Sequence, residues 1–257
     1  MANPNFSILL QEAVNKPGSI MRAYSAFHNY SLGNQLLALF QCQARGIEPG
    51  PIKTFPAWKD LGRHVKKGER AITLCMPVTV KRKAVADNEA EQDETFTTFV
   101  YKPRWFVLSQ TDGQAIEDPS IPGWDADRAI SALNIQRVEF TALNGNSQGY
   151  AQKRSIAINP VAQLPHKTLF HEIAHVVLGH TTEADFSDTE STPKNLCEVE
   201  AEAVALLCCE ALNLDGAEFC RGYIQQWLKL GSDSAIPEKS AQKILRAADQ
   251  ILKAGTV

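Results

Sequence analysis

The sequence contains no apolar run of about 20 residues, the length that a membrane-spanning helix requires. Its first ten residues also lack the basic segment and the apolar stretch of a secretory signal peptide, which argues against a secreted digestive protease. Six cysteines are present, but none belongs to a Cys-x-x-Cys pair, and Cys208 and Cys209 are adjacent within an apolar helical run, as buried thiols would be. We therefore predict a reduced, cytoplasmic protein with no membrane partner.

The length of 257 residues is sufficient for two domains, and the 44% of apolar residues is sufficient for a buried core. The net charge of −3 does not by itself predict a nucleic-acid-binding protein. That total conceals an uneven distribution, because residues 1–105 hold 14 Lys and Arg against 9 Asp and Glu, whereas the remainder holds 12 against 20. A basic front half and an acidic back half predict different partners for the two halves.

Hydrophobic spacing and turn residues predict a mixed α+β fold. We expect helices through about the first 45 residues, followed by a β-hairpin whose strands, 71–83 and 95–107, flank an acidic loop. Pro103 within the second strand indicates an edge or a bulge. A linker at 112–123 then leads to a back half with the following expected elements: strands at 138–142 and 155–158, and helices at 125–133, 168–178, 194–212, 217–230 and from Pro237 onward.

The segment His171-Glu-Ile-Ala-His175 has the HExxH spacing of a helical zinc site. Residues four apart lie on one face of a helix, so His171 and His175 can hold one ion while Glu172 reaches a water on the metal. The neighbouring residues are apolar, and burying two imidazoles and a carboxyl group among them is costly without a metal or partners. We therefore predict His171 and His175 as ligands and Glu172 as the general base, rather than a chance match.

A zinc site of this kind also needs a third protein ligand and an open position. Gly179 and His180 each miss the metzincin spacing by one place, so we expect His180 to cap the end of the helix. In the next predicted helix, Glu198 and Glu202 lie four residues apart on one face, flanked by alanines that permit close packing, whereas Glu200 points elsewhere. Any of the three glutamates remains a candidate ligand at this point, and a solvated acidic face is the alternative explanation.

This arrangement resembles the gluzincin metallopeptidases, of which thermolysin is an example. The resemblance implies that Glu198 is the third ligand and that Glu202 orients His171 or His175. Residues 150–160 resemble the edge strand along which such proteins bind an extended peptide. The resemblance to gluzincins further implies peptide hydrolysis, in which the metal activates a water and Glu172 accepts the proton of that water.

Aromatic and basic residues lie close together in the front half, a combination that suits single-stranded nucleic acid because bases stack on rings while cations contact phosphates. The candidate DNA-binding residues are Trp58, Lys59, Arg63, Lys66, Lys67, Arg70, Lys81, Arg82 and Lys83. Taken alone, these residues are explained equally well by ordinary surface charge beside core aromatics.

Three segments of the front half resemble the N-terminal domain of the ArdC antirestriction family of conjugative plasmids. They are Tyr30-Ser-Leu-Gly-Asn-Gln-Leu-Leu, Phe55-Pro-Ala-Trp-Lys-Asp-Leu-Gly and His64-Val-Lys-Lys-Gly-Glu-Arg-Ala. The family joins this domain to a C-terminal HExxH domain, in the order found here. One departure is Asp60, which stands where relatives often carry Gln. The resemblance implies single-stranded DNA binding and protection of incoming plasmid DNA from host restriction.

We accordingly predict residues 1–115 as a helical and β-hairpin domain that binds single-stranded DNA, and residues 116–257 as a gluzincin-like HExxH metalloprotease domain. One alternative is a cytoplasmic zinc metallopeptidase that cleaves a regulatory or host protein. A second is a binding protein whose metal only stabilises the fold. Zinc is the predicted ion, with manganese or cobalt as alternatives, because nitrogen and oxygen ligands accept all three.

Overall fold

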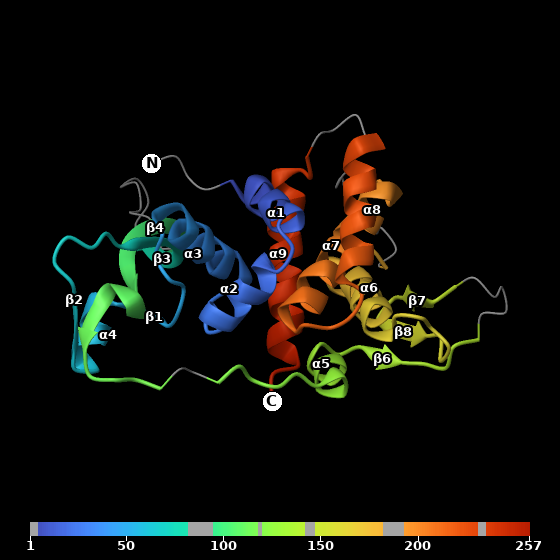
Figure 1. The fold of residues 1–257 in the computed structure, drawn as a ribbon. Helices are drawn as coiled ribbons and strands as arrows, with labels where there is room; N and C mark the ends of the chain where they lie inside the picture. The colour runs from blue at the N-terminus through green and yellow to red at the C-terminus, as the bar shows by residue number, and fades with distance from the viewer. Residues whose placement is uncertain (1–4, 82–94, 118–119, 142–146, 182–192, 231–234) are drawn as a thin grey trace, which may run out of the picture. The chain divides into compact units, whose positions relative to one another are not determined.

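The computed structural model describes residues 5–81, 95–117, 120–141, 147–181, 193–230 and 235–257. The chain divides into two compact units, Leu37–Asp118 (unit 1) and Pro4–Leu36 with Pro119–Val257 (unit 2), whose elements are labelled in Figure 1. Helices and strands are both well represented, which confirms the predicted mixed α+β class.

Unit 1 is built on an antiparallel sheet with the strand order β1-β4-β3, formed by Ile52–Thr54, Thr95–Val107 and Ile72–Lys81. The long β3–β4 pair confirms the expected hairpin. Its register shifts between Ile72 and Thr73, opposite Pro103, so the proline lies beside a bulge as expected. The remaining elements of the unit are the C-terminal part of α3 (Leu32–Arg45), α4 (Phe55–Asp60), β2 (Arg63–Val65), the 3-10 helix η1 (Leu108–Gln110) and β5 (Thr111–Gly113).

The core of unit 1 lies between α3, α4 and the sheet. Trp58 of α4 is fully buried and donates its indole N–H to the carbonyl of Phe106, at 2.8 Å. The side-chain amide of Gln41, on α3, bonds both the N–H and the carbonyl of Thr73 on the edge strand β3. These hydrogen bonds attach α3 and α4 to the sheet.

Unit 2 is mainly helical, and α7 (Lys194–Ala211) lies at its centre. This helix contacts α2 (Ser19–Phe27), α6 (Pro165–Leu178), α8 (Ala217–Leu230) and α9 (Glu238–Ala254), and residues 199–211 are buried throughout (Figure 1). The other helices are α1 (Phe6–Asn15) and α5 (Ala126–Ala132). The alanines, leucines and cysteines of α7 supply the apolar surface for its helix contacts. Its buried glutamates are each paired with a basic side chain: Glu200 with His180, Glu202 with Lys167 and Glu210 with Arg221.

The first two helices pack with the back half of the chain, whereas the predicted division at residue 115 groups them with the front half. Arg221 on α8 donates to the carbonyls of Ala13 and Val14 on α1 and to the carboxylate of Glu210 on α7. Glu210 in turn accepts the backbone N–H of Ile20 on α2, at 3.0 Å. Two residues far along the chain therefore complete the hydrogen bonding of both N-terminal helices, a contact that local sequence patterns cannot indicate.

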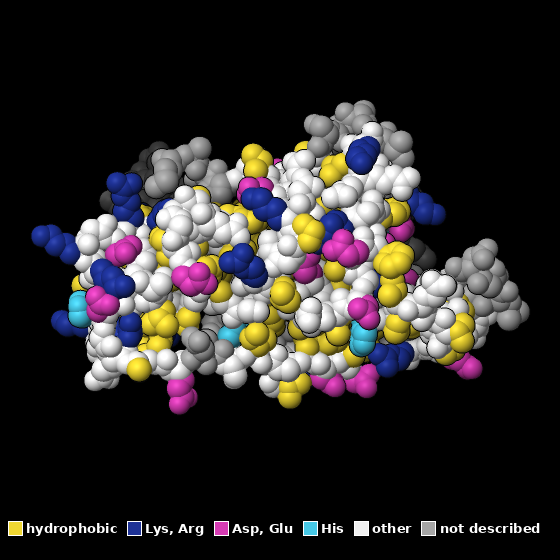
Figure 2. Space-filling view, in the orientation of Figure 1, with side chains coloured by type: hydrophobic (Ala, Val, Ile, Leu, Met, Phe, Trp, Pro, Cys, Tyr) yellow, Lys and Arg dark blue, Asp and Glu magenta, His cyan; other side chains and the backbone are white. Residues whose placement is uncertain are grey.

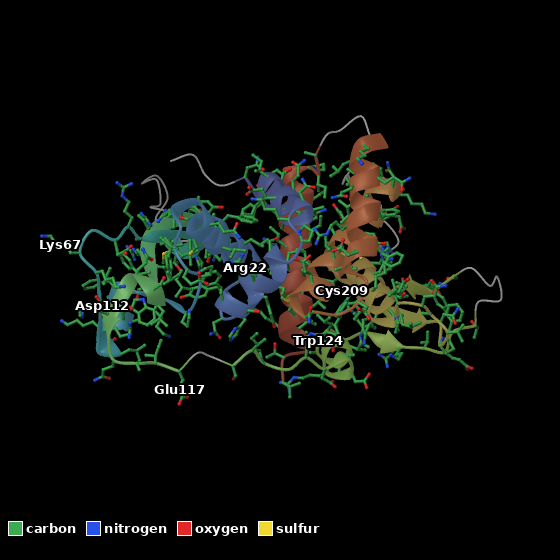
Figure 3. The ribbon with its side chains drawn as sticks, in the orientation of Figure 1. Arg22, Lys67, Asp112, Glu117, Trp124 and Cys209 are labelled. Carbon is green, nitrogen blue, oxygen red and sulfur yellow. The ribbon has the colours of Figure 1, made fainter. Side chains whose placement is uncertain are left out.

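The beginning of α9 also supports α1. The carboxylate of Glu238 accepts the backbone N–H groups of Phe6 (3.1 Å) and Ser7 (2.8 Å), which lack partners within their own helix. Near the other end of α9, the indole N–H of Trp124, labelled in Figure 3, donates to the carbonyl of Ile251. Segments from both halves of unit 2 thus meet on α9.

A small sheet lies against α6 and has the strand order β6-β8-β7, formed by Gln136–Arg137, Ser155–Ile158 and Gly149–Gln152. β8 pairs with β6 in parallel and with β7 antiparallel. The expected edge strand within residues 150–160 is therefore a hairpin whose later strand is central, and β7 forms the edge. The expected strand at 138–142 is replaced by the shorter β6, and residue 142 lies outside the described residues.

Candidate metal centre

Helix α6 brings the two histidines of the HExxH segment to one face. Pro165 stands in its first turn, where a missing N–H costs nothing, and Phe170 and Ile173 are fully buried on its apolar side. His171 and His175, one turn apart, place their Nε2 atoms 3.1 Å from each other. The local helix alone therefore positions two ring nitrogens toward one point.

Gly179 ends α6 and turns the chain back over the helix. Its φ of +80° is costly for residues with a Cβ, so glycine fits this position. Its N–H donates to the carbonyl of Val176 (3.2 Å), and the N–H of His180 donates to that of His175 (2.9 Å), which is the pairing of a Schellman motif. The helix end that we expected His180 to cap is thus closed by Gly179 and the backbone of His180.

Helix α7 supplies a carboxylate to the same point. Its buried Ala201 and Ala205 belong to the helix that packs against α6, and small residues there allow the two backbones to approach. Glu198 places Oε2 3.5 Å from Nε2 of His171 and 3.8 Å from Nε2 of His175. Within the described part of the chain, these three side chains are the only set of three or more His, Cys, Asp or Glu residues whose ligand atoms all lie within 4.8 Å of one another.

The dimensions of this cluster fit a small divalent ion. A point equidistant from the two Nε2 atoms and the Glu198 oxygen lies about 2.0 Å from each, close to the usual 2.0–2.2 Å for zinc with nitrogen and oxygen ligands. Three protein ligands would leave a fourth position for water or substrate. Two imidazoles and one carboxylate are ligands that suit zinc and manganese alike.

The electrostatics of the cluster also favour a cation. Burial opposes a charge on His171, but contacts with the carboxylates of Glu198 and Glu202 outweigh it and raise the pKa of His171. Burial, reinforced by the positive charge of His171, lowers the pKa of His175. The carboxylates of Glu198 and Glu202 therefore favour a positive charge at this pair of imidazole rings, which a bound metal ion would supply.

A second carboxylate from α7 contacts the far side of His171. Oε2 of Glu202 lies 3.4 Å from Nδ1 of His171, and its other oxygen accepts from Nζ of Lys167 at 2.6 Å. Burial alone would raise the pKa of Glu202, but the contacts with His171 and Lys167 lower it to about 2. Glu202 is thus held as a charged group beside Nδ1 of His171.

Glu172 is not one of the three clustered ligand residues, and it borders a cavity of about 250 Å³. The cavity is also lined by Gln148, Gly149, Gln163, Leu164, Lys167, Thr168, His171 and Phe219. Burial raises the pKa of Glu172 to about 7, so its carboxyl group can exchange a proton near neutral pH. A Cβ at Gly149, on the edge strand β7, would lie 2.8 Å from Cγ2 of Thr168 and 3.0 Å from both the carbonyl oxygen of Ala157 and Oε1 of Glu172, so glycine fits this close approach of β7 to α6 and β8.

Glu200 does not reach the ligand point, yet it belongs to the same network. Its Oε2 lies 2.9 Å from Nε2 of His180, and Nδ1 of His180 lies 3.1 Å from Nδ1 of His175. The sequence analysis named His180 as a helix cap and Glu200 as one of three candidate ligands, but it did not predict the contact between them. The available signal was His180 directly after a glycine that ends the helix, because a Schellman motif returns that position toward His175.

The structure separates the predicted DNA-binding residues into three groups. Trp58 is a core residue of unit 1, so the expectation that its ring stacks on bases is wrong. Arg63 belongs to the same structural group, because it is half-buried and its guanidinium donates to Thr111 and to the carbonyl of Gln114. The side chains of Lys81, Arg82 and Lys83 lie outside the described residues. Exposed positions are occupied by the remaining four, Lys59, Lys66, Lys67 and Arg70.

Unit 1 carries both exposed basic and exposed aromatic side chains, but the exposed aromatic residues differ from the predicted Trp58. Lys66 spans to the carbonyl of Ser109 and to Asp112, whereas Lys67 extends outward from the turn after β2 (Figure 3). Figure 2 shows Lys and Arg side chains over the α4 and β2 part of this unit, with Asp and Glu among them. The exposed rings are Phe55, Phe96 and Phe99, at 52%, 49% and 63% exposure.

The cysteines agree with the predicted buried thiols. Cys208 and Cys209 are fully buried, and burial raises the pKa of both thiols, that of Cys209 to about 12. All six cysteines are free. No helix in the described residues has both the length and the apolar character needed to cross a bilayer.

Comparison with known proteins supplies independent findings. Residues 10–104 match the family model of the N-terminal domain of the anti-restriction factor ArdC. The chain is also 25% identical, over 88% of its length, to an uncharacterised protein of Bacillus anthracis. The match spans 45% of that relative, so this chain corresponds to less than half of it.

Solved structures of a similar fold cover nearly the whole chain. The crystal structure of the antirestriction ArdC protein from plasmid R388, in its metal-free form, aligns over 97% of this chain and 94% of its own, with a TM-score of 0.57 and 20% identity. The Mn(II)-bound form of the same protein aligns over 98% of both chains, with a TM-score of 0.54 and 19% identity. At this identity the likeness shows a shared fold.

Proposed function

This chain belongs to the ArdC family through its N-terminal domain, and on that premise we propose that it is an antirestriction protein with a metallopeptidase-type centre in unit 2. In this role it protects incoming plasmid DNA from host restriction, and unit 1 binds single-stranded DNA. The observation that carries the proposal is the convergence of His171, His175 and Glu198, with the buried carboxyl group of Glu172 beside them.

The donor set defines what the centre can do. His171, His175 and Glu198 would hold a divalent ion, for which zinc is our first candidate and manganese or cobalt the alternatives. When bound, such an ion lowers the pKa of a coordinated water and polarises a substrate carbonyl. The chain's own groups supply the rest, since Glu172 takes up a proton at its carboxylate and Glu202, held by Lys167, orients the ring of His171.

Substrate alignment is the part that β7 would contribute. This strand is at the edge of its sheet and lies against α6, with Gly149 beside Glu172. An extended peptide can add to such an edge through main-chain hydrogen bonds, which places its carbonyl groups along the cavity. The same observation favours the second candidate function, a metallopeptidase that cleaves a regulatory or host protein and contacts DNA only incidentally.

The central test is plasmid transfer into a restricting host. We expect transfer to be protected by the wild type and unprotected with Glu172→Gln, which keeps the ligands, and with His171→Ala, which removes one. The matched control is His166→Phe, an exposed histidine on the same helix, with which we expect full protection. Full protection by both Glu172→Gln and His171→Ala would refute the proposed role of the centre. Protection that survives only Glu172→Gln would show that the metal stabilises the fold and does no chemistry.

The DNA-binding proposal is tested separately, by mobility shifts on single- and double-stranded oligonucleotides. We expect single strands to be bound, and the double variant Lys67→Ala/Arg70→Ala to bind them more weakly at low salt. Each phosphate contact with a single strand contributes about 0.7 to the magnitude of the slope of log affinity against log salt concentration. If both residues contact phosphates, that magnitude should therefore decrease by about 1.4 in the double variant. The exposed Lys239 of unit 2 gives the control variant Lys239→Ala. No shift with single strands at low salt would favour the metallopeptidase candidate instead.

A further inference from the structure

We propose that His180 and Glu200 act as positioning residues for the ligand His175, through a hydrogen-bonded series His175–His180–Glu200 that fixes the tautomer of the ligand ring. This inference rests on the proposed metal centre. It adds to that centre a second support, distinct from the direct contact of Glu202 with His171. The distances of the series are 3.1 Å between the two Nδ1 atoms and 2.9 Å from Nε2 of His180 to Oε2 of Glu200.

The hydrogen positions of the series follow from its last member. A charged carboxylate only accepts hydrogen bonds, so Nε2 of His180 must carry the hydrogen that points at Glu200. In a neutral ring the other nitrogen then has a lone pair, so Nδ1 of His180 accepts from Nδ1–H of His175. The remaining nitrogen of His175, Nε2, is left with its lone pair facing the ligand point. The series thus selects the tautomer that a metal needs.

The burial of the two residues gives this selection its strength. The side chain of His180 is 8% exposed and that of Glu200 is 1% exposed, so neither ring nor carboxylate can exchange its partner freely for bulk water. A buried carboxylate without a hydrogen-bonded partner is costly, and the contact with His180 offsets that cost. Breaking either contact would therefore change the hydrogen bonding of the His175 ring, because His180 joins that ring to Glu200.

The fold holds the series rigidly in place. The Schellman motif at Gly179 fixes the backbone of His180 against the last turn of α6, while Glu200 belongs to the buried central helix α7. The three glutamates of α7 consequently divide the work between them. Glu198 faces the ligand point, Glu202 contacts His171 directly, and Glu200 reaches His175 through the intervening imidazole.

The experiment measures zinc affinity of the full chain by competition with a chromophoric chelator, using Zn²⁺ alone as the probe. We expect His180→Phe and Glu200→Gln each to weaken zinc binding by about 10- to 100-fold, the usual effect of removing a partner of a ligating histidine. The double variant should bind zinc about as tightly as whichever single variant binds it less tightly, because both changes interrupt one series. His166→Phe on the same helix should bind as tightly as the wild type.

A second measurement reads the tautomer itself. In the zinc-loaded protein, long-range nitrogen–proton correlation spectra should show His180 as the neutral Nε2–H form, and this form should be lost in Glu200→Gln. Wild-type zinc affinity in both His180→Phe and Glu200→Gln, or an Nδ1–H form of His180 in the wild type, would overturn the inference. Equal zinc binding by the wild type and His171→Ala would instead overturn the metal centre on which it rests. If His180→Phe fails to fold, the isosteric Glu200→Gln and the spectra of the wild type still decide.

Discussion

The buried ion pair between Arg221 and Glu210 should control how firmly the N-terminal helices are held in unit 2. Arg221 is 4% exposed and Glu210 is 8% exposed, and together they bond the carbonyls of Ala13 and Val14 and the N–H of Ile20. The perturbation is Arg221→Met, which keeps most of the side-chain length while removing the cation and its donors.

The expected cost follows from what is left unpaired. Without the guanidinium, the carboxylate of Glu210 stays buried with a single donor, and the loss of one partner from a buried pair costs about 3–5 kcal/mol. Adding Glu210→Leu removes the stranded charge. Both variants lose the bonds of the guanidinium to the carbonyls of Ala13 and Val14, so these losses cancel in the comparison. The double variant additionally leaves only the N–H of Ile20 without its acceptor, which costs about 1–3 kcal/mol, less than the stranded charge. We therefore expect the double variant to be more stable than Arg221→Met alone.

Hydrogen exchange read by mass spectrometry is the suitable assay, because it reports on each segment. In Arg221→Met, protection of α1 and α2 should fall by about two orders of magnitude or more, at 1.36 kcal/mol for each factor of ten. The amides of unit 1 should be unchanged. Arg22→Met, which changes an exposed arginine of α2 labelled in Figure 3, is the control and should leave protection intact. Unchanged protection in Arg221→Met, or costs of the two changes that simply add, would refute the reasoning.

Three further predictions concern other parts of the chain. Gly149→Ala should leave zinc binding unchanged but abolish protection during transfer, because the new Cβ would press on Thr168, on the carbonyl of Ala157 and on the carboxyl group of Glu172, and so displace both the edge strand β7 and this carboxyl group; intact protection would contradict this. Glu238→Gln should lower the stability of unit 2 at pH 7 by about 1 kcal/mol, the usual value of a helix cap. Burial opposes the charge of Glu238, but hydrogen bonds from the N–H groups of α1 outweigh burial and lower the pKa of this carboxyl group. The wild type should therefore be more stable than Glu238→Gln above pH 4.5, and this difference should vanish in urea titrations as the pH falls further below 4.5. Trp58→Ala should destabilise unit 1 by about 3–5 kcal/mol in thermal unfolding, a loss that a ring exposed for stacking would not produce.

Local patterns predicted most of the helices and strands. The hairpin of β3 and β4, the bulge near Pro103 and the helices of the back half all follow from spacing, turn residues and proline positions that act over a few residues. The convergence of His171 and His175 was predictable for the same reason, since one helical turn fixes it. The proximity of Glu198 to these histidines depends on a contact between two helices, which local spacing does not predict. The resemblance to gluzincins was the basis for choosing Glu198.

Contacts between distant segments were beyond the sequence. The placement of α1 and α2 in unit 2 depends on Arg221 and Glu210, about 200 residues away from those helices. The error on Trp58 has a related cause, because a tryptophan beside a lysine suits a DNA-binding surface and a core equally well until its partner, the carbonyl of Phe106, is known. Spacing alone likewise could not join Glu200 to His180, since their contact depends on how the chain leaves α6.

The assembly of unit 2 from two separate segments imposes an order on synthesis at the ribosome. Helix α1 ends at Asn15 and α9 begins at Glu238, so about 220 residues emerge between the two, which takes about 10–45 s at ordinary rates of translation. All of unit 1 emerges within that interval and can fold before unit 2 has its last helix. Meanwhile the nascent chain must carry the apolar faces of α1 and α2 without their native partners. A chaperone that holds such faces should therefore raise the yield of folded protein more than it would for a chain of equal length whose domains follow one another.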